Sequence, residues 1–118
     1  MSRKRRPELF LKDILTAVER IKTYTNGLNF QEFSTNQMVI DAVIRNFEVI
    51  GEAVKKLPDE IKEKSPQVPW KEIAGFRDVL IHGYFSLSLK DIWATIEEDL
   101  EPLEVEVKKI LNEMEKKG

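Results

Sequence analysis

The chain has 118 residues and no cysteine; 34% of its residues are charged, 42% are hydrophobic, and the formal net charge is −2. This composition suits one small globular domain over residues 1–118 and excludes disulfides, thiolate metal sites and thiol catalysis. No apolar run approaches the roughly 20 residues that a membrane helix needs. We therefore expect a cytoplasmic protein that does not span a membrane, in which any nucleic-acid-binding surface is a local patch.

A first helix is predicted to begin at Pro7, because proline is tolerated in a first turn, and to end at Asn26-Gly27. Its apolar stripe consists of Leu11, Ile14, Val18 and Ile21. The basic segment before it, residues 1–6, is expected to form a flexible tail. The alternative for this segment is an arm that contacts RNA phosphates or an acidic partner.

A second helix is predicted after the residues at 34–36, which are Ser, Thr and Asn and therefore suit an N-cap, and Pro58 ends it. The connector before it is expected to carry one helical turn that turns Phe30 and Phe33 inward. Along the helix, six apolar residues recur every three or four positions: Val39, Val43, Phe47, Ile50, Val54 and Leu57. This spacing predicts one buried face and one polar face.

The remaining sequence predicts a loop with one short turn over 58–69 and a third helix over about 70–84. A long last helix is expected to begin with a capping box formed by Ser88 and Asp91. Pro102 should kink this helix, because proline removes one hydrogen bond and crowds the preceding turn. Four long amphipathic helices with short links predict an all-α fold, an antiparallel four-helix bundle with one or two extra helical turns in the connectors.

The third helix carries the only histidine of the chain, in the stretch RDVLIHGYF at 77–85. On an ideal helix Arg77 and His82 lie about 140° apart and do not point at one spot, whereas Asp78 and His82 share a side. Spacing alone favours ordinary structural roles for these residues. Asp78 and His82 would form a surface pair, the stem of Arg77 would cover apolar surface, and Tyr84 would be a ring at the edge of the core.

The same stretch matches the Arg-x4-His-x-Tyr signature of HEPN-domain proteins, in particular the HepT-like toxin family. Two further segments resemble the family's second and last helices: AVIRNFEVIGEAVKKLP at 42–58 and DIWATIEEDLEPL at 91–103. VPWKEIAGFRDVLIHGYF at 68–85 resembles its motif-bearing segment, and LFLKDILTAVERIKTYTNGLNFQEF at 9–33 fits its opening. The resemblance therefore covers nearly the whole chain.

This resemblance implies a HEPN-like helical bundle that forms a homodimer, with the two motifs facing each other across the interface. Many members of the wider family are metal-independent ribonucleases, so the resemblance implies an RNA substrate and neither a cofactor nor a metal. The HepT-like members resemble toxins of type VII-like toxin-antitoxin systems, which are encoded beside a small nucleotidyltransferase antitoxin called MntA. The resemblance implies that such a partner silences the toxin by transferring AMP groups to Tyr84.

The chemistry of metal-free RNA cleavage suits the residue types of the motif. It needs a proton carrier and positive charge around the phosphorus, and His82 fits the first role and Arg77 the second. Asp78 and Tyr84 are interpreted as supporting residues. Because each chain has one histidine, a base and an acid acting together require His82 of a second copy, which a twofold dimer supplies.

Three polar residues of the second helix, Arg45, Asn46 and Glu52, are candidates to line a cleft beside the motif. The alternative is a ladder of ion pairs along the helix, such as Arg45 with Glu48, with Asn46 partly buried and hydrogen-bonded. For the whole protein, the alternative to an RNA-cleaving toxin is a non-catalytic nucleotide-binding or regulatory module that docks a nucleotidyltransferase.

Overall fold

The computed structural model of the chain describes residues 6–82 and 88–117, and every regular element in this part is a helix. In chain order the helices are α1 (Pro7–Thr25), α2 (Phe30–Ser34), α3 (Gln37–Lys56), α4 (Asp59–Lys62), α5 (Trp70–Ile81), α6 (Leu89–Glu98) and α7 (Leu100–Lys117). Among the described residues, none of the helices has the length and apolar character needed to cross a membrane.

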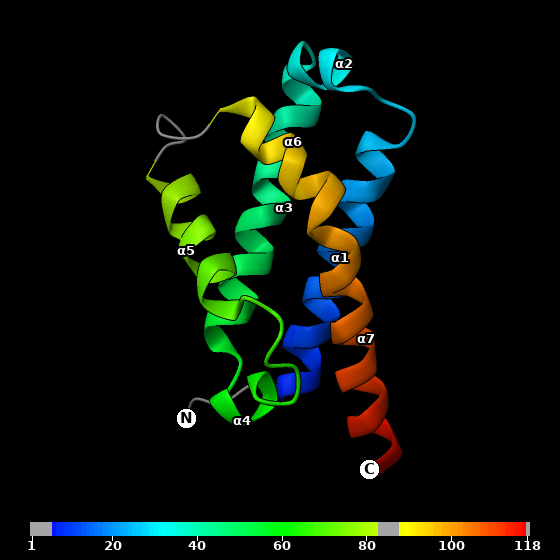
Figure 1. The fold of residues 1–118 in the computed structure, drawn as a ribbon, viewed down its shortest axis with the longest axis vertical. Coiled ribbons are helices and arrows are strands. Elements are labelled where there is room, and N and C mark those ends of the chain that lie inside the picture. Colours follow the sequence, from blue (N-terminus) through cyan, green and yellow to red (C-terminus); the bar gives the residue numbers. More distant parts are fainter. Residues whose placement is uncertain (1–5, 83–87, 118) are drawn as a thin grey trace.

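Successive long helices run antiparallel and form a bundle (Figure 1). Helix α3 lies between α1 and α5 and packs against both, while α7 packs along α1. Helix α5 makes its main contacts with α3, so that its opposite side faces away from the rest of the bundle. The predicted all-α four-helix bundle is confirmed, with α2 and α4 as the extra short turns in the connectors.

The core is formed by the apolar stripes that the sequence predicts. The stripe residues of α1 are fully buried, as are most of those of α3, and Phe33 of α2 is buried with them. Three further apolar residues of α3, Ile40, Ile44 and Ala53, are also buried and widen its apolar face beyond the predicted stripe. This wider face is what allows α3 to pack against a helix on each side.

The helix ends follow the predicted capping signals. Gly27 has a φ of 80°, the left-handed conformation that favours glycine, directly after α1. The side chain of Asn36 accepts a hydrogen bond from the Val39 backbone N–H at the start of α3. At the start of α6, Ser88 and Asp91 form the predicted capping box, with both hydrogen bonds at 3.2 Å.

The predicted single last helix is instead two helices, α6 and α7, separated at Asp99. The proline explains the position of the break, because the ring of Pro102 crowds the carbonyl of Glu98, four residues earlier, where α6 ends. The two halves cover different neighbours: Trp93 of α6 lies 5.0 Å from Phe33 of α2, ring centre to ring centre, whereas α7 packs along α1. Carboxylates at the break are exposed on the surface: Glu97, Glu98, Asp99 and Glu101.

The predicted third helix corresponds to α5 but is shorter in the described part of the chain. It ends at Ile81, and His82 is its C-cap residue. The last two residues of the predicted range, Gly83 and Tyr84, lie outside the described residues. At its other end Trp70 is buried, and its indole N–H donates to the backbone oxygens of Lys62 and Ser65, which ties the start of α5 to the preceding loop.

Candidate active site

Helix α5 is held against α3 by a contact that needs a glycine. Phe76 of α5 packs edge-on against Phe47 of α3, with ring centres 5.3 Å apart. Next to this pair, Arg77 lies directly on Gly51 of α3, where an added Cβ would lie only 2.8 Å from the Arg77 Cγ and 3.3 Å from its Cα. Any larger residue at position 51 would therefore push Arg77, and with it the motif, away from α3.

The guanidinium of Arg77 lies between two carboxylates. Its Nη1 donates to Oδ1 of Asp78 at 3.1 Å, and its Nη2 lies 3.9 Å from Oε2 of Glu52 on α3. The side chain is 23% exposed, whereas its Nε is buried and has no hydrogen-bond partner among the described residues. Because the side chain as a whole is partly exposed, an anionic ligand that displaced Asp78 could reach the guanidinium.

Lys55 of α3 completes this group. Its Nζ donates to Oδ1 of Asp78 at 2.9 Å, the same oxygen that accepts from Arg77. The hydrogen bond from Lys55, followed by that from Arg77, lowers the pKa of Asp78 below its usual value, so its carboxylate is ionised at neutral pH. Lys55 is not among the predicted site residues. In the sequence, Lys55 lies on the polar face of the second predicted helix, one turn after Gly51. This position points to the site only when it is known that α5 packs against α3 at Gly51.

His82 is exposed at the end of α5, and its backbone N–H donates to the backbone oxygen of Asp78 at 3.2 Å. The expected surface pair between the side chains of Asp78 and His82 is absent from the described residues, because the Asp78 carboxylate bonds Lys55 and Arg77 instead. No hydrogen bond or ion pair in this part of the chain joins His82 to Arg77 either. The ideal helix accounts for this, since it places the two residues about 140° apart.

Two exposed apolar residues lie beside the motif on α5. Val79 is 36% exposed and Ile81 is 46% exposed. On an ideal helix of about 100° per residue, Asp78 and His82 fall between them on the side that faces away from Leu80, which is buried. The outward side of α5 therefore carries polar motif residues flanked by uncovered apolar side chains.

Of the three candidates on the second helix, Glu52 is brought to the motif. Besides its contact with Arg77, its Oε1 lies 3.5 Å from Nζ of Lys56 one turn further along α3. Glu52 also borders a small hollow of about 130 Å³ between α1 and α3. It is therefore placed to hold Arg77.

The other two candidates have local partners on α3. Arg45 forms the alternative ion pair with Glu48, at 3.5 Å. Asn46 is buried, and its side-chain amide donates to the backbone oxygen of Ala42 at 2.8 Å, as expected for a partly buried, hydrogen-bonded residue. In the described part of the chain, neither forms a hydrogen bond or ion pair with Arg77, Asp78 or His82.

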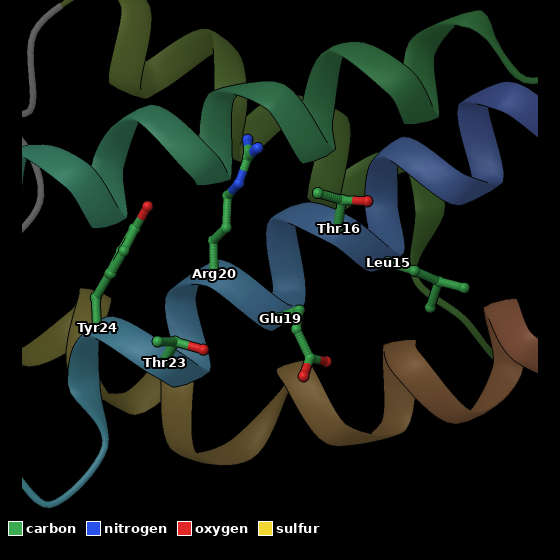
Figure 2. Close-up of a pocket in the computed structure, with 6 residues that line it drawn as sticks. All are labelled: Leu15, Thr16, Glu19, Arg20, Thr23 and Tyr24. Carbon is green, nitrogen blue, oxygen red and sulfur yellow. The ribbon is translucent and has the colours of Figure 1, made fainter.

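A second surface feature is a shallow hollow of about 360 Å³ on the outer face of α1 (Figure 2). Its lining residues all come from α1: Leu15, Thr16, Glu19, Arg20, Thr23 and Tyr24. Figure 2 shows Arg20 and Tyr24 directed toward α3 and Glu19 directed toward α7. None of the six belongs to the motif. Within residues 6–82 and 88–117, no three His, Asp or Glu residues gather as a metal site would require.

Comparison with known proteins gives a consistent result. The family described as Ribonuclease HepT-like matches residues 14–110, a range that includes the whole motif. A protein of Methanocaldococcus jannaschii named "Putative RNase" is 43% identical over 114 residues, which are 97% of this chain and 98% of that protein. A protein of Thermococcus cleftensis named "Probable ribonuclease HepT" is 38% identical over 107 residues, 91% of this chain and 97% of its own. No solved structure matches the chain.

Proposed function

Because the chain belongs to the HepT-like ribonuclease family, we propose that it is a metal-independent endoribonuclease whose active site forms between two copies of the chain. The observation that carries this proposal is the arrangement of the motif on α5. Arg77 is partly exposed beside Asp78 and Glu52, and His82 is exposed at the end of the same helix. In this proposal His82 carries protons and Arg77 binds the phosphate.

The second copy is needed for two reasons. A base and an acid acting in one step require two proton carriers, and each chain has one histidine. In addition, on an ideal helix Arg77 and His82 of one chain lie about 140° apart, so an Arg77 from the other copy is better placed to approach His82. The exposed side chains of Val79 and Ile81 support self-association through this side of α5, because uncovered apolar surface favours an interface.

The proposed reaction is a transfer within the RNA chain. One His82 takes the proton from a ribose 2′-hydroxyl, whose oxygen attacks the adjacent phosphorus. The bond from phosphorus to the 5′-oxygen breaks, and His82 of the other copy gives a proton to that leaving oxygen. The products are a 2′,3′-cyclic phosphate and a free 5′-hydroxyl. Arg77 stabilises the negative charge that builds up on the phosphorus oxygens during the step.

We further propose that the protein acts as a toxin whose activity an MntA-like nucleotidyltransferase silences by attaching AMP to Tyr84. Tyr84 lies outside the described residues. It follows His82 by two residues, and two residues of fully extended chain span at most about 7 Å. An AMP group on Tyr84 would bring a phosphate and a base close to the motif, where it would compete with RNA for Arg77 and repel its backbone.

The proposed nuclease activity is tested with purified, unmodified protein and total RNA in the presence of EDTA. We expect the wild-type protein to fragment the RNA and His82→Ala to do so at least about 100-fold more slowly, the usual contribution of a general acid or base. His82 is exposed, so its replacement should leave the thermal unfolding curve unchanged. Glu72→Ala, a change at another exposed residue of α5, is the matched control and should cleave normally.

The alternative is a binding module without catalysis that docks a nucleotidyltransferase and accepts AMP. A folded, unmodified dimer that leaves RNA intact would favour this module and contradict the nuclease. The modification is tested separately by intact mass after incubation with the nucleotidyltransferase and ATP. We expect a mass increase in units of AMP that is lost in Tyr84→Phe; an increase that persists in Tyr84→Phe would remove this assignment.

A further inference from the structure

Two cations from different helices converge on one oxygen atom beside the motif. Lys55 Nζ of α3 and Arg77 Nη1 of α5 both donate to Oδ1 of Asp78, at 2.9 and 3.1 Å. Both nitrogens therefore face the same point in space. An oxygen of a phosphate group that took the place of this carboxylate oxygen would meet both positive charges.

This convergence is built into the packing of the two helices. Because Gly51 has no side chain, the backbone of α3 can approach Arg77, which occupies the space where a Cβ would lie. Lys55 follows Gly51 by one helical turn, so it extends from the same side of α3 toward α5. The positions of Lys55 and Arg77 relative to each other are thus set by the backbone.

The group is open to a ligand because its charged side chains are partly exposed. The side chains of Lys55 and Asp78 are 43% and 47% exposed, and that of Arg77 is 23% exposed. Lys55 and Arg77 both bond the Asp78 carboxylate, and Glu52 lies 3.9 Å from Arg77. Asp78 balances the two converging cations in the free protein, and an incoming polyanion can replace it because all partners lie near the solvent.

We propose that Lys55 is a second phosphate-binding residue, which acts together with Arg77 on the RNA backbone while Asp78 serves as their counterion until RNA binds. This inference rests on the proposed nuclease function and adds a residue that the motif does not contain. Arg77 contacts the phosphate that is cleaved. Lys55 contacts the same phosphate or the next one along the strand, and its role is to hold the RNA in register.

The test compares Lys55→Gln, Lys55→Arg and the wild-type protein in cleavage of a short single-stranded RNA over a range of salt concentrations. We expect Lys55→Gln to raise KM about tenfold with a smaller change in kcat, as for the loss of one hydrogen bond to a charged group. The slope of log(kcat/KM) against log salt should become shallower by about 0.7, the contribution of one phosphate contact to a single strand. Lys55→Arg should restore both quantities.

Lys64→Gln is the matched control, because it removes the same charge from an exposed lysine that lies outside α3 and α5. It should leave KM and the salt slope close to wild type. An unchanged slope in Lys55→Gln, or equal effects of the two substitutions, would overturn the proposal, since either result would mean that Lys55 contributes only general charge or structure. Thermal unfolding of each variant confirms that the fold is retained.

A binding measurement separates this inference from the nuclease function. Fluorescence anisotropy of a 2′-O-methyl RNA, which lacks the attacking hydroxyl, measures affinity without cleavage. We expect Lys55→Gln to weaken this affinity about tenfold. If the wild-type protein does not cleave RNA, the nuclease proposal fails, and this measurement still decides the role of Lys55. If the affinity is equal in wild type and Lys55→Gln, the role of Lys55 is refuted even where cleavage is observed.

Discussion

The side chain of Arg77 lies on the backbone of Gly51 with no room for a Cβ between them, since an added Cβ would lie 2.8 Å from the Arg77 Cγ. We therefore expect Gly51→Ala to destabilise the fold by about 1–3 kcal/mol, the usual cost of overpacking, despite the better helix propensity of alanine. RNA cleavage should fall with it, because Arg77 is displaced. Urea unfolding and a cleavage assay on the same samples measure both effects.

Gly75→Ala is the control for this substitution. Gly75 lies on α5, and an added Cβ there would have nothing within 4 Å. The exchange should leave the free energy of unfolding unchanged or raise it by up to about 1 kcal/mol through helix propensity. Equal stability of the two variants would contradict the close contact between Gly51 and Arg77.

The pH dependence of stability should report the bonds of Asp78. Lys55 and then Arg77 lower its pKa below the usual 3.8. A carboxyl group with a lowered pKa in the folded state stabilises the fold above its unfolded pKa and loses this effect as the pH falls through the folded value. We expect the wild-type protein to be more stable than Asp78→Asn at pH 7, and the difference to disappear as the pH falls below 3.8.

Urea unfolding at pH values from 7 down to 2.5 measures this difference. Glu113→Gln, which removes an exposed carboxylate of α7, controls for the loss of one negative charge. A stability difference between wild type and Asp78→Asn that is the same at both ends of this range would show that the charge of Asp78 is not what stabilises the fold.

Substitution of Ile81 should separate folding from assembly. Ile81 is 46% exposed in the single chain, so Ile81→Asp should preserve the helical circular dichroism spectrum, whereas a charge at an apolar interface should prevent self-association and with it cleavage. Sedimentation velocity measures the mass. Val105→Asp, at a residue of α7 that is 47% exposed, is the matched control and should remain dimeric and active. An active monomer would refute the proposed two-chain site.

Lys22 ties α1 to α7 through two ion pairs. Its Nζ lies 2.9 Å from Glu101 and 2.7 Å from Glu104, and Glu104 is only 7% exposed. In Lys22→Met, the buried carboxylate of Glu104 keeps one ion pair among the described residues, with Lys108, whose Nζ lies 3.8 Å from its Oε2. We expect a loss of about 1–2 kcal/mol in the free energy of unfolding, less than for a fully buried pair because Lys22 is partly exposed.

Lys12→Met is the control for Lys22→Met, since the pair of Lys12 with Glu115 is 54% exposed on both sides and should contribute little. The carboxylates of Glu104 and then Glu101 raise the pKa of Lys22 above 10.5. The stabilisation by Lys22 should therefore be complete below pH 10.5 and decrease as the pH rises through the raised pKa. Equal stability of Lys22→Met and wild type at pH 7 would contradict this role.

The fold could be predicted from the sequence because its signals are local. The stop at Asn26-Gly27, the cap at Ser88 and the break at Pro58 each act within a few residues, and the apolar stripes identify the buried faces without knowledge of the neighbours. The division of the last helix at Asp99 is the main difference. Pro102 predicts a kink in the last helix. Whether the kink becomes a complete break depends on the separate contacts of α6 with α2 and of α7 with α1.

The site could be predicted only in part. The residue types of the motif are visible in the sequence, and so is the angle between Arg77 and His82. The contact of Arg77 with Gly51 and the bond from Lys55 to Asp78 join different helices, so they depend on how α5 is positioned along α3. The predicted side-chain pair of Asp78 with His82 is wrong for this reason. The spacing of residues within α5 carries no information about Lys55 of α3, which bonds Asp78 instead.

The exposed carboxylates where α6 meets α7 have a consequence for the proposed binding of RNA. Glu97, Glu98 and Asp99 form a negatively charged boundary, and the chain as a whole carries a formal charge of −2. We expect this boundary to repel a polyanion that approaches along it. Repulsion by these carboxylates can thus select the direction from which RNA approaches, before the protein contacts any individual base.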